Sequence, residues 1–420
     1  MRELNRGWKR LAFLLLLLAP APVFAQAKAE GPEPRKTIDA DTSRSYLRLA
    51  FNFYEQKDGG GNPNVDENMQ VLQPMFLLGV GLSEKLSLSL KGQGGLVSAA
   101  STNSGARTTA GSAGGGGGGG DDDEEEDDED GAVSGASGGG GDDGGSSLAD
   151  GDRFFGLEAG LFYAWSDQVG VGAGVSYNKE DAYRSIGGNA RFVYTTRDKN
   201  DTFLIRVSAS FDTVDIRLFD GTGGGSENRN TYGLGLGWTH VLGRKTQGTL
   251  SYDLTYQNGF LSTSYNSVLV AGTEVQEILP DTRLRHSVFA RIRHLLLDYL
   301  AVEPGVGFYV DDWGAVASSF ELHAFWEFIP GVLILQPSYR FHWQRQISYF
   351  TGESESSVPR YRTQDSDLDT FTNHTFGLKL VAPSVKIFGV DTEFELGGDY
   401  TFRSDRLNCF SVTFGFLVRF

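Results

Sequence analysis

The sequence predicts an all-β chain that closes as a transmembrane antiparallel β-barrel of about sixteen strands. Two observations lead to this prediction. Segments of about ten to fourteen residues with alternating apolar and polar side chains recur from residue 45 onward, and a tilted strand needs this length to cross a bilayer. The links between these segments alternate between tight turns and longer stretches, as they do in a barrel with one short-looped rim and one long-looped rim.

The final segment, 409–420, shows the alternation most clearly, since every second residue counted back from Phe420 is large and apolar. These residues are Phe420, Val418, Phe416, Phe414, Val412 and Phe410. An ordinary sandwich strand is the alternative, but outer-membrane barrels end in this way because their assembly machinery recognises an aromatic-terminated last strand. We therefore predict an assembly signal at Phe416, Val418 and Phe420, with outer-membrane lipid and the barrel-assembly machinery as partners.

The first 44 residues predict export of the chain. Basic residues precede the apolar run 11–19, and small residues near Ala25 offer a cleavage site, so we predict a signal peptide at 1–25. Residues 26–44 lack periodicity and are predicted to be a periplasmic lead before the barrel domain, 45–420. The sequence thus predicts a protein of the bacterial outer membrane. Its single cysteine, Cys409, excludes a disulfide within the chain.

The alternation predicts sixteen strands. They fall at 45–56, 70–81, 85–98, 153–165, 169–178, 183–196, 202–214, 230–241, 246–257, 283–296, 299–310, 316–328, 332–346, 371–381, 388–402 and 409–420. Tight turns are expected at the periplasmic rim, including one at 383–387. Longer external links are expected at 57–69, 99–152, 215–229, 258–282 and 347–370, with short external links near Glu180 and Asp311.

The link 99–152 has a composition unlike that of a folded segment. Seven consecutive glycines begin at Gly114, and ten consecutive acidic residues begin at Asp121. Because so little apolar surface cannot offset the entropy cost of ordering, we predict a disordered external loop. Weak binding of divalent cations is the alternative, since calcium prefers carboxylate oxygens. This acidity, within a net formal charge of -17, argues against nucleic-acid binding.

Charged and imidazole side chains gather on one face of the last seven predicted strands, and we predict that they line the lumen. The candidates are Arg283, Arg285, Arg291, Arg293, Glu303, Glu321, His323, Glu327, Arg340, His342, Lys379, Glu393 and Glu395. Cross-strand pairing that neutralises charge is the structural interpretation, and a charge-selective permeation path is the functional one. We favour pairing with some selectivity.

The inward histidines do not require a metal site. His323 and His342 are predicted on adjacent strands with Glu321 and Glu327 nearby, but a water-filled hydrogen-bond network is favoured over metal coordination. The sequence holds no nucleophilic triad and no phosphate-binding glycine loop that fits its strand pattern. We therefore predict no metal, no cofactor and no enzymatic activity.

Three motifs resemble one bacterial family. PDTRLRH at 280–286 resembles the family's PDTRxRH signature, FYVDDWG at 308–314 resembles its DDWG signature, and QPSYRF at 336–341 is similar to the segment that follows. The family is an outer-membrane β-barrel family of unknown function. The resemblance therefore implies a barrel of this size and little about activity.

The first two motifs fall at the external ends of the predicted strands and define a rim motif. Its residues are Asp281, Arg283, His286, Asp311, Asp312 and Trp313. The first interpretation is that these residues lock a long loop onto the rim, with Trp313 in the lipid girdle. Ligand capture is the second interpretation.

As a hypothesis, the barrel is a passive or selective channel for small solutes. The alternative is a closed barrel that acts as a surface or partner-binding component of a redox or metal-handling assembly.

Deleting Phe420 is expected to lower the amount of folded protein in the outer membrane far more than it alters any solute contact, because the aromatic end of the last strand belongs to the assembly signal. Membrane fractionation and heat-modifiable electrophoretic mobility measure this effect. Normal outer-membrane levels of the truncated chain would contradict the assembly role.

Overall fold

The computed structural model describes residues 45–58, 68–97, 152–180, 182–219, 222–263, 266–352, 355–387 and 390–420. The predicted signal peptide, the predicted periplasmic lead and nearly all of the predicted acidic loop lie outside the described residues. Within the described ranges, no helix is long and apolar enough to cross a membrane.

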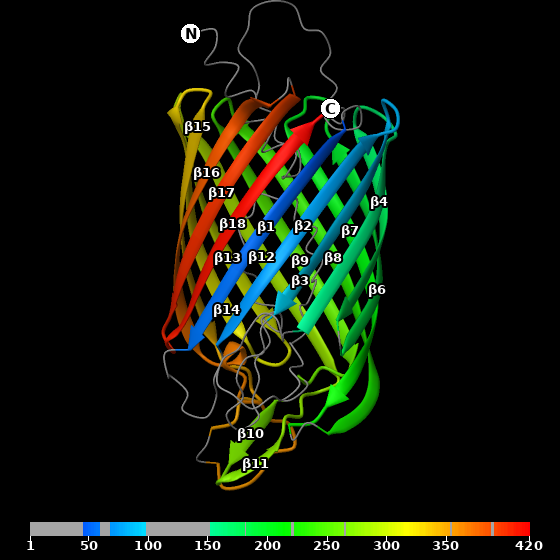
Figure 1. Cartoon of the computed structure of the whole chain (residues 1–420), viewed down its shortest axis with the longest axis vertical. Coiled ribbons are helices and arrows are strands. Elements are labelled where there is room, and N and C mark those ends of the chain that lie inside the picture. The colour runs from blue at the N-terminus through cyan, green and yellow to red at the C-terminus, as the bar shows by residue number, and fades with distance from the viewer. Residues whose placement is uncertain are drawn as a thin grey trace, which may run out of the picture.

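Sixteen strands form one closed antiparallel barrel, seen from the side in Figure 1. They are β1 Tyr46–Asp58, β2 Met69–Gly81, β3 Leu86–Val97, β4 Asp152–Ala164, β5 Val169–Glu180, β6 Tyr183–Thr195, β7 Asp201–Arg217, β8 Gly223–Gly243, β9 Thr246–Gly259, β12 Thr282–Leu297, β13 Leu300–Asp311, β14 Val316–Ile329, β15 Leu333–Arg345, β16 Phe371–Ile387, β17 Val390–Arg403 and β18 Leu407–Arg419. The predicted fold class and strand number are confirmed.

The last strand closes the barrel against the first. β18 pairs with β17 on one side and with β1 on the other, in a register that runs from Tyr46↔Arg419 to Asp58↔Leu407. Beyond the strand ends, the Phe420 N–H donates to the Ser45 carbonyl at 2.9 Å, and the Ser45 N–H donates to the Phe420 carbonyl at 3.2 Å. The barrel therefore has no free sheet edge along its length.

The two faces of the strands differ as a barrel in lipid requires. Large apolar side chains such as Phe51, Leu161, Ile205, Phe308 and Phe376 are exposed on the outer surface. The residues between them point inward, where many are charged, hydroxylated or glycine. This is the alternation of apolar-out and polar-in that characterises membrane barrels.

The structure corrects three of the predicted links. The link predicted at 215–229 is wrong, because β7 continues to Arg217 and β8 starts at Gly223, and an Arg229–Asp212 ion pair of 2.9 Å joins the extended ladder. The link predicted at 258–282 contains a hairpin of β10 (Ser267–Val270) and β11 (Thr273–Gln276), which lies beyond the barrel rim in Figure 1. The turn predicted at 383–387 belongs to β16.

Candidate functional site

The strand register sets which side chains face the lumen. Directly paired residues share a face, so Arg285 and Asp311 lie on one side of the sheet, as do Glu321 and Arg340. This side is largely buried, whereas the intervening residues, such as Phe320, are exposed on the outer surface. By the same parity, every predicted lumen residue lies on the inward face.

Near the rim with tight turns, inward charges pair across strands. Glu395 of β17 lies 2.7 Å from Arg48 of β1 and 3.5 Å from Lys379 of β16. Glu393, which is fully buried, lies 3.2 Å from Arg419 of β18. Burial of an ionised carboxylate is costly without a cationic partner, so these contacts serve to neutralise charge.

A second ion-pair network joins β12, β13 and β14. Glu303 lies 2.5 Å from Arg293 Nε and 3.6 Å from Arg291 Nη1. The Arg293 guanidinium also stacks over the Phe325 ring, 4.3 Å from its centroid. The network therefore combines charge pairing with aromatic contact at one point of the lumen wall.

The other predicted lumen residues have varied surroundings. Glu321 lies 3.3 Å from Arg340 Nε. Glu327 accepts a hydrogen bond from the Gly331 N–H at 2.7 Å, so it supports the turn between β14 and β15. The buried His342 ring packs 5.8 Å from the Phe371 ring.

The structure does not gather the inward histidines into a metal centre. In the register, His323 lies opposite Ser338, and His342 lies opposite Ser319. Among the described residues, no group of three or more His, Cys, Asp or Glu side chains is arranged to hold a metal ion. The two histidines are instead separate parts of the lumen wall.

An apolar cluster shares the lumen with these charges, and the sequence analysis missed it. It consists of Ala301, Phe325, Ile334, Val381 and Leu417, all buried, with Tyr46 and Leu295 packed against it. Strand parity carries the signal that could have found it, since Phe325 lies between His323 and Glu327 on the same inward face. The β12–β18 side of the lumen is therefore a wall of packed apolar and ion-paired side chains.

The Arg283–Asp311 ion pair holds the external rim motif together. Arg283 Nη2 lies 2.6 Å from Asp311 Oδ2. The fully buried Asp311 side chain also accepts hydrogen bonds from the Tyr309 hydroxyl at 2.9 Å and from the Ala315 N–H at 2.8 Å. One carboxylate thus connects β12, β13 and the short link that follows β13.

Trp313 lies inside the rim, so its predicted place in the lipid girdle is wrong. The side chain is only 3% exposed. Its ring lies 4.3 Å from the Arg283 guanidinium, and its Nε1 donates to the Thr282 carbonyl at 2.8 Å. A buried indole gains a cation–π contact and a hydrogen bond in this position.

The rest of the rim motif is peripheral to that pair. Asp312 accepts a hydrogen bond from the Leu284 N–H at 2.9 Å. Asp281 is exposed. His286 lies on the outward face of β12, where its Nδ1 is 2.8 Å from the Tyr252 hydroxyl. The structure therefore does not bring His286 together with the buried pair.

Two external links contact each other at the rim, through the Ile278–Arg362 bridge and the hydrogen bond that the Thr363 hydroxyl donates to Glu277. We call them the external cap, which comprises the described residues of 260–281 between β9 and β12 and of 346–370 between β15 and β16. One cluster combines Leu279, Ile347 and Leu368 of the cap with the lumen-facing Tyr309 and Ala317. Because these two residues point into the lumen, part of the cap lies across its external mouth.

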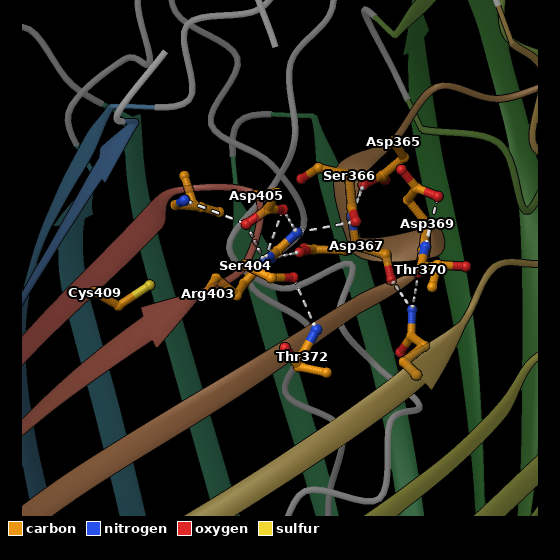
Figure 2. Close-up of polar contacts among 12 residues, drawn as sticks. Asp365, Ser366, Asp367, Asp369, Thr370, Thr372, Arg403, Ser404, Asp405 and Cys409 are labelled. Atoms are coloured by element: carbon orange, nitrogen blue, oxygen red, sulfur yellow. Dashed lines mark hydrogen bonds and ion pairs between the residues drawn. The ribbon is translucent and has the colours of Figure 1, made fainter. Parts of the chain in front are cut away.

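Arg403 of β17 contacts the same cap at residues 366 and 367, as Figure 2 shows. Its guanidinium forms ion pairs with Asp405 and with Asp367, which belongs to the short helix η2 (Ser366–Leu368). It also donates to the Ser366 carbonyl at 2.9 Å and packs 4.1 Å over the Phe371 ring. The link 346–370 is therefore fixed to the lumen side of β13, β14 and β17.

A buried glutamate ties the two parts of the cap to each other. Glu277, 2% exposed, accepts hydrogen bonds from the Thr263 N–H at 2.7 Å, the Thr363 hydroxyl at 2.6 Å and the Asn266 side-chain amide at 3.4 Å. Burial raises the pKa of the Glu277 carboxyl above its ordinary value. Folding thus shifts the protonation equilibrium of this carboxyl toward its neutral form relative to the unfolded chain.

The opposite wall of the lumen has a different chemistry. A cavity of about 160 Å³ lies against strands β2 to β8. Its lining is mostly glycine, serine and carboxamide side chains, with Lys91 and Glu158 as its charged residues. The sequence predicted no candidate site here, because glycine, serine and carboxamide side chains in a strand show neither a charge pattern nor a catalytic motif.

The closed barrel, with its apolar outer surface and polar lumen, has the architecture of an outer-membrane β-barrel protein. Residues 217–400 match the model of the family described as "Protein of unknown function (DUF3570)". This match confirms the resemblance to a family of unknown function, and the three motifs at 280–286, 308–314 and 336–341 all lie within it.

The comparison with curated proteins found no significant match. Among solved structures, the chain is similar to a bacterial polysaccharide outer membrane secretin at 10% identity and a TM-score of 0.44, covering 90% of this chain and 98% of that one. It is also similar to the siderophore receptor PirA from Pseudomonas aeruginosa at 11% identity and a TM-score of 0.39, covering 86% of this chain and 56% of the receptor. A third similar structure is OpdK with vanillate, also from Pseudomonas aeruginosa, at 10% identity and a TM-score of 0.38, covering 90% of this chain and 98% of OpdK. The chain thus spans little more than half of the siderophore receptor, and these identities are too low to transfer any ligand.

Asp311→Ala is expected to loosen the external rim strongly, because it leaves the buried Arg283 guanidinium without its carboxylate, a loss of roughly 3–5 kcal/mol for a buried pair. Asp312→Ala is the matched control, since it removes one hydrogen bond worth about 1 kcal/mol. Limited proteolysis measures how readily the rim segments are cleaved, and heat-modifiable electrophoretic mobility shows whether the barrel is folded. Equal protease resistance of the two folded variants would contradict the locking role of the ion pair.

The stability of the cap is expected to fall as pH rises. Because the pKa of Glu277 is raised by folding, its stabilising contribution is complete at low pH and is lost as pH rises through the folded-state pKa. Cleavage within the cap by an added protease should therefore become faster at higher pH, after normalisation to an unfolded substrate.

Glu277→Gln, which cannot ionise, should reduce this pH dependence to the part that comes from Asp369, a cap residue whose pKa burial also raises. Glu274→Gln on the neighbouring hairpin should retain the full pH dependence. A wild-type cleavage rate that does not change with pH, or a Glu277→Gln variant that behaves like wild type, would refute the role of this carboxyl.

Proposed function

We propose that this protein is a channel for small hydrophilic solutes in the bacterial outer membrane. The observation that carries the proposal is the unequal lumen wall. One side is filled by ion pairs, apolar side chains and the clamped link 346–370, whereas the other side keeps a polar cavity of about 160 Å³. Because this space is lined by hydrogen-bonding groups and is larger than one water molecule needs, it offers a hydrophilic solute a polar space inside the barrel.

Selectivity by charge is expected to be weak in this channel. Arginines of β12 and β15 have carboxylate partners within the wall, such as Glu303 for Arg293 and Glu321 for Arg340. Paired charges at close range present little net field to a passing ion. The proposed channel therefore selects by shape and hydrogen bonding more than by charge.

The second candidate function is a surface component that binds a partner, such as a redox or metal-handling assembly. The ordered cap favours this alternative. The side chains of Val268 and Val270 in the β10–β11 hairpin are 0% and 1% exposed, so one face of the hairpin is packed against the rest of the protein. A projecting hairpin held in this way can present a fixed surface to another protein.

Purified, heat-modifiable protein in planar bilayers is expected to give stable single-channel conductance steps. Arg403→Gln should increase conductance or its fluctuations, because it removes the ion pair that holds Asp367 over the mouth. Arg345→Gln is the matched control. Arg345 is an exposed arginine at the same rim, and it donates to the Gly314 carbonyl at 2.9 Å.

If correctly folded wild-type protein shows no conductance, the channel function is refuted and the partner-binding alternative remains. Identical single-channel currents for the Arg403→Gln variant and wild type would show that the link 346–370 does not limit conduction.

A further inference from the structure

The cavity on the β2–β8 wall has the size and polarity of a solute-binding site. Its volume is about 160 Å³, whereas one water molecule needs only roughly 10–15 Å³. The neutral polar side chains along it include Gln93, Ser176, Asn178, Ser208, Ser210 and Thr231. These residues come from strands β3, β5, β7 and β8, so the polar surface extends across several neighbouring strands of the wall.

Glycines on adjacent strands make room for the hydroxyl groups. A Cβ atom at Gly187 would lie 2.5 Å from Ser176 Oγ, and one at Gly233 would collide with Ser208 Oγ. Any larger residue at either position would therefore displace a hydroxyl. The pairing of glycine with serine across strands keeps both the hydroxyls and the space beside them.

The lining side chains suit a solute that both donates and accepts hydrogen bonds. Serine and threonine hydroxyls do both, and the carboxamides of Gln93 and Asn178 carry a donor and an acceptor on one planar group. The charged residues of the lining, Lys91 and Glu158, lie directly opposite each other on β3 and β4. Their opposite charges leave the cavity without a net preference for an anion or a cation.

The wall formed by β12 to β18, which we call the far wall, does not change this balance of charge. Most of its inward cations are within ion-pair distance of carboxylates, as in the contacts of Arg293 with Glu303 and of Lys379 with Glu395, and Arg285 donates to the neutral Gln257 carboxamide. A solute in the cavity therefore meets neutral hydrogen-bonding groups on one side and compensated charge on the other. A neutral, hydroxyl-rich molecule matches that environment best, because it requires no counter-charge and can exchange water for protein hydroxyls.

We propose that this cavity binds a neutral polyhydroxylated solute, a sugar or polyol, and that such solutes are what the channel passes. The proposal rests on the channel function proposed above and adds the class of solute and the residues that recognise it.

Glucose, gluconate and glucosamine test the proposal, because they share a carbon skeleton and differ in charge. Glucose should reduce the single-channel current saturably, whereas the carboxylate and ammonium analogues should do so far more weakly. Saturation-transfer NMR of detergent-solubilised protein measures glucose binding without any requirement for conduction.

Two double variants locate the site. Ser208→Ala with Ser210→Ala should weaken glucose binding by roughly thirtyfold, because two hydrogen bonds of about 1 kcal/mol each are lost without any added volume. Ser319→Ala with Ser338→Ala changes two lumen serines on β14 and β15 of the far wall and should leave glucose affinity unchanged.

The two proposals fail in different ways. If the protein conducts, but glucose neither blocks the current saturably nor gives a saturation-transfer signal in NMR, the sugar site is refuted and the channel function is not. If folded protein binds glucose in the NMR measurement but shows no conductance in bilayers, the sugar site is supported and the channel function is refuted. Equal glucose affinity for the two double variants overturns the assignment of the site to the β7 hydroxyls.

Discussion

The backbone pairing of β18 with β1 is the constraint on which the rest of this structure depends. Inside a bilayer no water can satisfy an unpaired peptide group, and each such group costs several kcal/mol, so a membrane sheet must close. Closure fixes the register from Tyr46↔Arg419 to Asp58↔Leu407 and thereby decides which side chains point inward along every strand. The ion pair of Arg48 on β1 with Glu395 on β17, which spans β18, exists only because of that closure.

The lumen that results has two unlike halves. Strands β12 to β18 supply long charged and apolar side chains that occupy space and neutralise one another, and the clamped link 346–370 covers the same side. Around the cavity, strands β2 to β8 supply short inward side chains, among them glycines whose replacement would collide with neighbouring hydroxyls. Elsewhere on this wall lie the buried cluster of Met69, Val71, Val97 and Phe154 and the Arg229–Asp212 ion pair. In the channel that we propose, the solute path therefore follows the side of the cavity and lies off the barrel axis.

Much of this architecture follows from the sequence, because a two-residue period is a local signal. The alternation of Arg283, Arg285, Arg291 and Arg293 with apolar residues was enough to predict their inward face. Trp313 was misplaced because an aromatic at a strand end suits a lipid girdle as well as it suits a buried cation–π partner. Its burial brings it into contact with Arg283, which lies 4.3 Å from its ring and is distant in sequence.

Other features depend on contacts between segments far apart in the chain. The Arg403 clamp joins residues about 36 positions apart, and Glu277 binds Thr363 across 86 positions. No local sequence pattern predicts either contact. The polar cavity was missed for a further reason, since glycine and serine in strands usually indicate nothing beyond relief of crowding, and only the closed barrel shows that they face one shared space.

The central claim, an off-axis path along the β2–β8 wall, is tested most directly by cysteine accessibility. With the single native thiol removed by Cys409→Ser, one new cysteine is placed at Ser210 on the cavity wall or at Ser319 on the far wall. The rate of reaction with a membrane-impermeant thiol reagent added outside intact cells is then measured. The account predicts much faster modification at position 210 than at position 319, and equal rates or the reverse order would contradict it.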